Sequence, residues 1–153
     1  MKTWQKVLLG LIVLTVLTVI NLPRGLRNNN PGNIRKSGDD WQGLSPRHDD
    51  GEFFIFKNPF WGLRALARIL INYGRRHDIT TLRGIIERYA PSNENDTEAY
   101  IAAVSKRTGI GPEQTFVIDD ALGFLVPAIV RHEIGFQPFT RDLIERAILE
   151  AKV

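Results

Sequence analysis

The sequence predicts a mainly α-helical fold with a small β-hairpin region, preceded by an N-terminal transmembrane helix. Three observations predict it: an uncharged apolar run at the start, turn-forming residues over 24–51, and apolar residues at helical spacing from residue 58 onward. A length of 153 residues fits one domain with a short appendage. We therefore divide the chain into residues 1–23, a signal anchor or transmembrane segment, and residues 24–153, a single domain.

Composition excludes several classes of function. The formal charge is +3, but Lys2 and Lys6 precede the apolar run and the rest of the chain is nearly neutral, so we expect no nucleic-acid partner. The absence of cysteine excludes a disulfide framework and thiolate metal sites. The three histidines, His48, His77 and His132, have no metal-binding spacing. We therefore expect no metal ion and no cofactor.

The N-terminal run over residues 7–22 carries no charge until Arg24. It is slightly shorter than the roughly 20 residues that a spanning helix needs, but it extends back to Trp4, whose ring suits a membrane interface. No pair of small residues marks a cleavage site between Thr18 and Gly25, which favours an uncleaved anchor over a cleaved signal peptide. The sequence thus predicts a single-pass membrane protein whose soluble domain is periplasmic or exterior.

The first part of the body predicts turns and short strands. Residues 24–51 are rich in Gly, Asn, Asp, Pro and Ser. In "RNNNPGNIR", residues 27–35, the asparagines can cap turns and Pro31-Gly32 can form a tight turn. Asp50-Gly51 then precedes a β-prone run over 53–56, which predicts the return strand of a hairpin.

Two helices follow the hairpin. Asn58 fits the N-cap of the first and Pro59 its first helical position, with Gly74 marking its end. The second spans residues 81–89 and stops before Pro91, because the residue before a proline disfavours the helical conformation.

Three more helices complete the domain, and the first two begin with a capping residue. The middle one is apolar nearly all round, so we expect it to be buried, and Pro127 inside it predicts a kink. The predicted N-caps of the first two are Asn95, in capping-box spacing with Glu98, and Asp119, while Gly109 and Gly135 follow their ends; the last helix starts at Thr140.

The end of the middle helix, "RHEIG", places Glu133 at the edge of the core. Partial desolvation there raises the pKa of a carboxyl toward the range useful to a general acid, as glycosidases require. A glutamate at a helix end can also be a solvated charge or a partner of Arg131. His132 points about 100° away from Glu133 on the helix, so we interpret it as structural or solvated.

Five segments in succession resemble one family. "RNNNPGNIR", "GDDWQGL", "FIFKNPFWGLRALARIL", "RYAPSNENDTEAYI" and "RHEIGFQP" are similar to segments of phage-type peptidoglycan-degrading and virion-associated proteins of the lysozyme-like superfamily. The resemblance covers roughly residues 24–140. It implies that residues 24–153 form a lysozyme-like domain acting on the glycan of the bacterial cell wall.

The order of the motifs implies a circular permutation. In glucosaminidase and lysozyme-like domains, an asparagine-rich hairpin and a strand-to-helix entry follow the helix that ends in the catalytic glutamate. Here the apolar N-terminal run stands in that place and contains no acid, whereas the helix ending in Glu133 is displaced toward the other end of the domain. We expect Glu133 to fill the catalytic position beside the 28–56 hairpin region, although Ile134 departs from the small or polar residue usual there.

The resemblance implies that Glu133 protonates the glycosidic oxygen between N-acetylmuramic acid and N-acetylglucosamine. Hydrolysis needs a second carboxylate, for which Asp40, Asp50 and Glu52 are candidates, although turn formation explains each of them as well. Without such a carboxylate, a lytic transglycosylase is expected, with the muramoyl 6-hydroxyl as nucleophile.

Substrate binding requires amide and aromatic side chains along the cleft. Amides and tyrosines can hold N-acetyl groups, and Trp41, in a polar stretch, can stack on a sugar ring. The expected substrate-binding residues are Asn29, Asn30, Asn33, Trp41, Gln42, Tyr89, Asn95 and Tyr100.

Together these features predict a membrane-anchored, phage-derived enzyme, a muramidase or lytic transglycosylase, for cell-wall penetration or lysis. Its expected partners are peptidoglycan, the lipid bilayer of the host inner membrane or virion through residues 7–22, and other virion proteins. Two alternatives remain: a non-catalytic virion or envelope structural protein that binds peptidoglycan, and an endopeptidase on the same scaffold.

Overall fold

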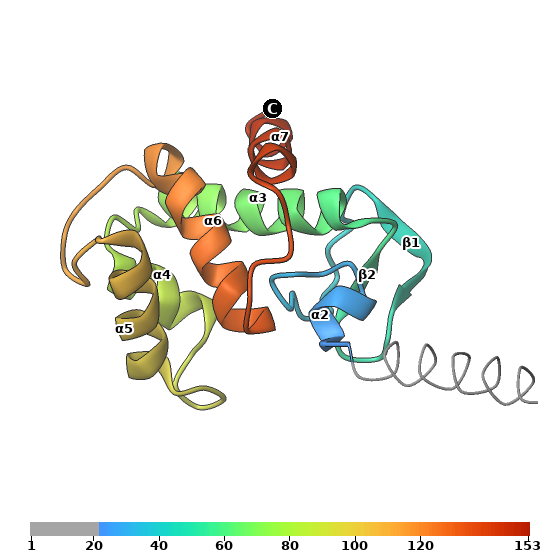
Figure 1. Cartoon of the computed structure of the whole chain (residues 1–153), viewed down its shortest axis with the longest axis horizontal. Helices are drawn as coiled ribbons and strands as arrows, with labels where there is room; N and C mark the ends of the chain where they lie inside the picture. The colour runs from blue at the N-terminus through green and yellow to red at the C-terminus, as the bar shows by residue number, and fades with distance from the viewer. Residues whose placement is uncertain (1–21) are drawn as a thin grey trace, which may run out of the picture.

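The computed structural model describes residues 22–153, which form a mostly helical domain with a two-stranded sheet. Figure 1 shows α3 running through the domain, with α4 and α5 on one side of α6 and α2 and the hairpin on the other. This confirms the expected helical fold with a small β-hairpin. The elements are α2 (Arg24–Arg27), β1 (Leu44–Asp49), β2 (Phe54–Phe56), α3 (Pro59–His77), α4 (Leu82–Tyr89), α5 (Thr97–Thr108), α6 (Ile118–Ile134) and α7 (Arg141–Ala151).

The predicted N-terminal transmembrane helix requires correction. No helix within residues 22–153 has the length and apolar character needed to cross a membrane. The most apolar of them, α6, is 17 residues long, and its apolar side chains pack into the domain core. The predicted span over 7–22 lies almost wholly outside the described residues. The single-pass topology, the membrane location and the bilayer partner are therefore not supported.

The hairpin forms where the sequence predicts it. Strands β1 and β2 pair antiparallel, with Leu44 opposite Phe56 and an irregular register toward the turn. Gly51 has a φ of 101°, which glycine adopts at little cost, so Asp50-Gly51 does make the turn. Phe54 and Phe56 are buried, and the hairpin is thereby fixed to the domain core.

Helix α3 begins as predicted, with Asn58 at the N-cap and Pro59 as its first residue. It does not end at Gly74 but continues to His77, and Asp78 ends it in the left-handed conformation with a φ of 53°. A Cβ at Gly74 would lie 3.5 Å from the side chain of Ile118, an ordinary contact, and glycine inside a helix costs only about 1 kcal/mol relative to alanine, so Gly74 does not end α3.

The later helices differ from prediction mainly at their first residues. Asp96 rather than Asn95 caps α5, its carboxylate accepting from the amide of Ala99 at 3.0 Å. Helix α6 begins one residue before Asp119. It also continues unbroken through Pro127. The ends at Gly109 and Gly135 are as expected, whereas Thr81 and Thr140, expected as the first residues of their helices, are the N-caps of α4 and α7.

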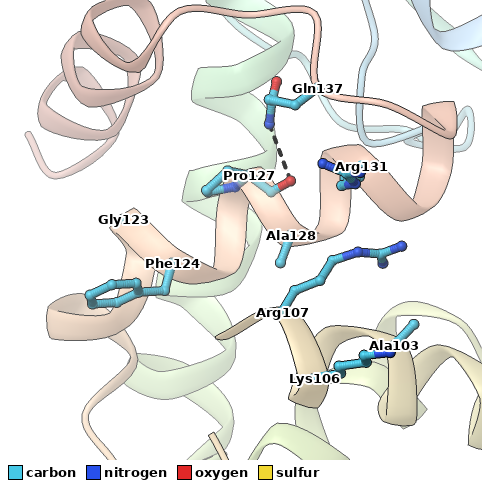
Figure 2. A pocket seen from close by; sticks show the side chains of 9 residues that line it. All are labelled: Ala103, Lys106, Arg107, Gly123, Phe124, Pro127, Ala128, Arg131 and Gln137. Carbon is cyan, nitrogen blue, oxygen red and sulfur yellow. Dashed lines mark hydrogen bonds between the residues drawn. The ribbon is translucent and has the colours of Figure 1, made fainter. Parts of the chain in front are cut away.

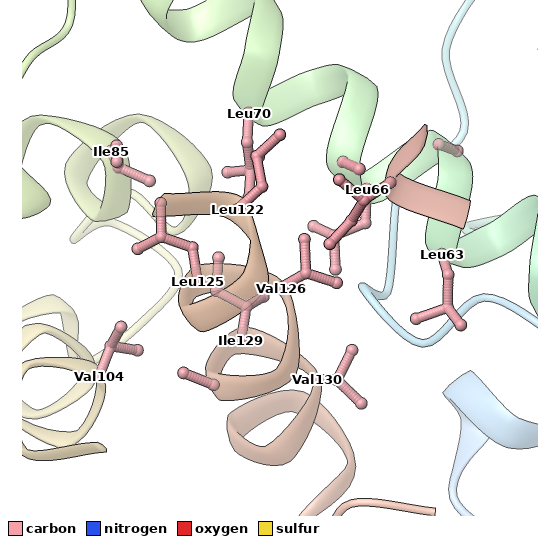
Figure 3. Packing of buried hydrophobic residues seen from close by; sticks show 14 of the residues in the cluster. Leu63, Leu66, Leu70, Ile85, Val104, Leu122, Leu125, Val126, Ile129 and Val130 are labelled. Carbon is pink, nitrogen blue, oxygen red and sulfur yellow. The ribbon is translucent and has the colours of Figure 1, made fainter. Parts of the chain in front are cut away.

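The core is built around α6, which confirms that this helix is buried. Figure 3 shows its apolar side chains against those of the surrounding helices. The residues labelled there on α6 are Leu122, Leu125, Val126, Ile129 and Val130, and they face Leu63, Leu66 and Leu70 of α3, Ile85 of α4 and Val104 of α5. Burial on several sides fixes the position of the last turn of α6, which carries Glu133.

Candidate functional site

The last turn of α6 lies against the asparagine-rich turn. The amide nitrogen of Asn33 donates to Oε2 of Glu133 at 2.9 Å, and the hydroxyl of Tyr100 donates to Oε1 at 2.8 Å. Asn33 and Glu133 are 100 positions apart in the chain. The spatial contact on which the permuted arrangement depends is therefore present, and three elements meet at one carboxyl group.

The asparagine turn is held by its own side chains. Asn30 is completely buried; its amide nitrogen donates to the carbonyls of Ile34 and Phe54, and its Oδ1 accepts from the amide of Ile34. Asn33 has a φ of 46°, in the left-handed region that asparagine tolerates better than most residues. This conformation is part of the turn from which the Asn33 side chain reaches Glu133.

Tyr89 and Tyr100 form a second support. The hydroxyl of Tyr89 donates to the carbonyl of Gly32 and so ties α4 to the asparagine turn. Burial raises the pKa of both tyrosines, and the nearby carboxylate of Glu133 raises it further. The hydroxyl of Tyr100 therefore stays protonated at neutral pH and keeps donating to Glu133.

Glu133 itself is mostly buried. Burial raises the pKa of its carboxyl, and this outweighs the hydrogen bonds from Asn33 and Tyr100, which lower it. Within residues 22–153 no arginine, lysine or histidine makes a salt bridge to Glu133, so the alternative of an ion pair with Arg131 is not seen. A buried carboxyl without a cation is suited to hold and donate a proton.

Two cavities open onto Glu133. The larger, of about 460 Å³, is lined by Asn33, Tyr89, Asn95 and Glu133 among others. The smaller, of about 250 Å³, is lined by Asn95, Tyr100 and Glu133, together with His132. Five of the expected site residues thus line two cavities that share Asn95 and Glu133.

The other four expected binding residues line neither cavity. The amide nitrogen of Asn29 donates to the carbonyl of Phe56 at 3.0 Å, and Asn30 is buried in the turn. Trp41 is half-buried against the core, and Gln42 is exposed on the hairpin side. The side-chain amides of Asn29 and Asn30 therefore bind backbone carbonyl groups and are not available to a ligand.

The three candidates for a second carboxylate also lie elsewhere. Asp50 accepts from Nε and Nη2 of Arg24 at 2.7 and 2.9 Å, and Glu52 accepts from Arg24 and from Arg35 at 2.6 and 2.9 Å. These hydrogen bonds hold the pKa of both carboxyls below its usual range. Asp40 is exposed. Asp50 and Glu52 join the hairpin to α2, and none of the three lines a cavity beside Glu133.

Two other carboxylates do line the cavities. Glu94 lines the larger cavity and pairs with Arg35 at 3.0 Å, and Asp96 lines the smaller one while capping α5. Glu94 and Asp96 are the chain neighbours of Asn95, which is expected at the cleft from the sequence. Their position beside Asn95 is the sequence signal that could have identified them.

His132 packs flat on Tyr100, with ring centroids 3.6 Å apart and an interplanar angle of 16°. It therefore supports the residue that donates to Glu133, in agreement with a structural role. In the described part of the chain, no three His, Asp or Glu side chains gather where they could hold a metal ion.

Comparison with known proteins relates the chain to a phage protein. No family model matches the chain, so membership of a lysozyme-like family is not shown. Protein P5 of Pseudoalteromonas phage PM2 is 41% identical over 126 residues, which cover 80% of this chain and 78% of that protein. Identity at this level over most of both chains shows common descent. The chain therefore belongs to the family of the phage protein P5.

Proposed function

We propose that this phage-type protein cleaves the glycan strand of bacterial peptidoglycan, with Glu133 as the general acid. The observation that carries the proposal is the state of Glu133: it is mostly buried, unpaired by any described cation and held by two neutral donors at the junction of two cavities. Burial without a cation raises the pKa of this carboxyl, and it outweighs the two hydrogen bonds, so Glu133 stays protonated to higher pH than an exposed glutamate does.

The reaction begins with proton transfer from Glu133 to the glycosidic oxygen between N-acetylmuramic acid and N-acetylglucosamine. The C1–O bond breaks, and the departing sugar keeps the proton as a new hydroxyl. Asn33 and Tyr100 donate to the two oxygens of the carboxylate that remains, so the charge formed on Glu133 is stabilised where it appears.

The second step favoured here is that of a lytic transglycosylase. The muramoyl 6-hydroxyl attacks C1 and forms a 1,6-anhydro ring, and the Glu133 carboxylate takes the hydroxyl proton, which restores the acid. The two other carboxylates that line the cavities are already engaged, Glu94 with Arg35 and Asp96 with the start of α5. Because this route needs only one carboxyl, it suits the site better than hydrolysis.

Asn95 is the residue best placed to bind the substrate beside Glu133. It borders both cavities, is exposed, and donates only to the carbonyl of Pro91 at 3.2 Å, so its amide oxygen can accept from an N-acetyl group. Tyr89 and Asn33 complete the wall on the side of the asparagine turn.

The test compares the wild type and Glu133→Gln on purified peptidoglycan. Loss of a general acid lowers the rate by about 10²–10⁴-fold. Glu145→Gln, an exposed glutamate on α7, is the matched control and should cleave at the wild-type rate. Mass spectrometry of the products then separates 1,6-anhydro sugars from reducing ends. Cleavage by Glu133→Gln at the wild-type rate would refute the assignment.

A second candidate is a structural protein that binds peptidoglycan without cutting it. It is favoured by Ile134, which departs from the expected small or polar residue and is buried in the core beside Gly25. In this case the wild type sediments with cell walls and releases no muropeptide. Release of free amines without new sugar ends would instead identify an endopeptidase.

A further inference from the structure

A groove separate from the two cavities at Glu133 runs between α5 and α6. Its volume is about 660 Å³. Figure 2 shows Phe124 at one end and Arg131 at the other, with Arg107 reaching from α5 toward the Arg131 end. Small residues, Ala103, Gly123 and Ala128, lie along it, and Lys106 adds a further positive charge. The groove thus combines a shallow apolar surface with three cations.

None of the three cations has an anionic partner among residues 22–153. Lys106, Arg107 and Arg131 are exposed and make no salt bridge there, whereas arginines such as Arg24 and Arg83 each pair with two or more carboxylates. Phe124 is 64% exposed, which is unusual for so large an apolar side chain. Three like charges around one groove repel one another, and an anionic ligand would relieve that repulsion.

The groove adjoins the site at Glu133. Helix α5 contributes Tyr100 to the smaller cavity and Arg107 to the groove, while α6 contributes His132 to the cavity and Arg131 to the groove. The pKa of His132, which lines the smaller cavity, is lowered mainly by burial. The charge of Arg107, which lines the groove, lowers it further, so Arg107 acts on both spaces. The two spaces share no lining residue, but both lie along the same two helices, so the groove offers a separate surface to a branch of a ligand held at Glu133.

We propose that this groove binds the acidic stem peptide of peptidoglycan, so that the substrate is peptide-bearing glycan rather than bare glycan. The inference rests on the proposed function. The stem peptide branches from muramic acid, next to the bond that would be cleaved, and carries several carboxylates on a short chain with small methyl side chains. Arginine and lysine bind carboxylates through charge-assisted hydrogen bonds, and Phe124 with the alanines offers apolar contact to the methyl groups.

The first test measures binding without catalysis. The tripeptide L-alanyl-γ-D-glutamyl-meso-diaminopimelate is titrated into the full-length protein by calorimetry. We expect Lys106→Gln, Arg107→Gln and Arg131→Gln combined to weaken binding at least about tenfold, because each removes a charge-assisted contact. The control variant combines Lys57→Gln, Arg76→Gln and Lys152→Gln, three exposed cations outside the groove, and should bind as the wild type does.

The outcomes of the titration are decisive in each direction. Absence of tripeptide binding by the wild type, or equal binding by the groove variant, would overturn the inference. If an oligoglutamate peptide binds as tightly as the tripeptide and depends on the same three cations, the groove is instead a surface for acidic proteins, and the inference is again overturned.

The second test measures cleavage of two substrates, intact peptidoglycan and glycan strands from which an amidase has removed the stem peptides. The wild type should prefer the intact substrate, and the groove variant should lose this preference while keeping its rate on the stripped strands. Equal rates for the wild type on both would refute the groove and leave the proposed function standing. If the wild type cleaves neither, the proposed function fails, and the titration alone decides the groove.

Discussion

Glu133 and Asp50 carry the same chemical group in opposite surroundings. Asp50, at the hairpin turn, accepts two hydrogen bonds from Arg24 and one from Asn28, and its pKa lies well below the usual range. Glu133, at the end of α6, meets only the neutral donors Asn33 and Tyr100 and has a raised pKa. The difference shows what the neighbouring groups decide. A carboxyl paired with an arginine is ionised and joins two parts of the fold, whereas a buried carboxyl without a cation keeps its proton to higher pH and can act as an acid.

The largest expected effect separates the two residues by activity. Glu133→Gln should lower the rate of glycan cleavage about 10²–10⁴-fold, because it removes the proton donor. Asp50→Asn should leave the rate per folded molecule close to that of the wild type, because Asp50 lines neither cavity. Rates on purified peptidoglycan check both. An equal loss of cleavage rate in the two variants would contradict the assignment of Glu133 as the acid and of Asp50 as a residue that only holds the hairpin to α2.

For stability we expect the larger loss at Asp50 rather than at Glu133. Asp50→Asn breaks the paired hydrogen bonds with Arg24 and should lower the free energy of unfolding by about 1–3 kcal/mol at neutral pH. The folded-state pKa of Asp50 is lowered from 3.8, so its contribution is present above that pH and is lost as the pH falls through the folded value. Urea unfolding at neutral pH and below 3.8 measures this, and a deficit that persists unchanged in acid would argue against the ion pair as its cause.

The donors to Glu133 should tune its titration. Tyr100→Phe removes a hydrogen bond that lowers the pKa of Glu133, so this pKa should rise further. The high-pH limb of the activity profile, where the acid loses its proton, should then move to higher pH. Tyr73→Phe, which removes the hydroxyl of a tyrosine that lines the larger cavity and makes no hydrogen bond to Glu133, is the control. A profile that moves to lower pH would contradict the expected role.

The smallest expected effect is on the stability of the acid itself. The folded-state pKa of Glu133 lies above its ordinary value of 4.5, so its contribution to stability is present below 4.5 and is lost as the pH rises through the folded value. Glu133→Gln should therefore be slightly more stable than the wild type at neutral pH, with the difference vanishing below 4.5. Thermal unfolding of both proteins at neutral pH and below pH 4.5 measures this difference. A variant less stable than the wild type at neutral pH would show that the folded state stabilises the ionised carboxylate of Glu133.

Sequence patterns located the helices because their signals are local. Pro59 at the start of α3 and Gly135 after α6 act through the backbone of one residue, which the sequence shows directly. The cap of α5 was misplaced by one position because Asn95 and Asp96 can both cap a helix, and only the folded backbone chooses between them. Gly74 shows the limit of a local signal, because glycine marks helix ends and yet costs only about 1 kcal/mol inside a helix, as in α3.

The site was harder to predict than the fold. Asn29, Asn30 and Asn33 are chemically identical in the sequence, but their backbone angles and burial send the first two into the domain and the third to Glu133. The meeting of the asparagine turn with Glu133 was expected from a family resemblance, since no local pattern encodes a contact across 100 positions. The engagement of Asp50 and Glu52 by Arg24 depends equally on distant parts of the chain.

The bond between Asn33 and Glu133 also sets an order in time. The ribosome completes the asparagine turn 100 residues before it adds Glu133, so every shorter nascent chain has one wall of the site and no acid. Helix α6, which carries the acid, must then pack against α3 and α5 before the carboxyl reaches its donors. Under the proposed function, unfinished chains are therefore harmless to the cell that makes them, and lytic activity begins only with a folded protein.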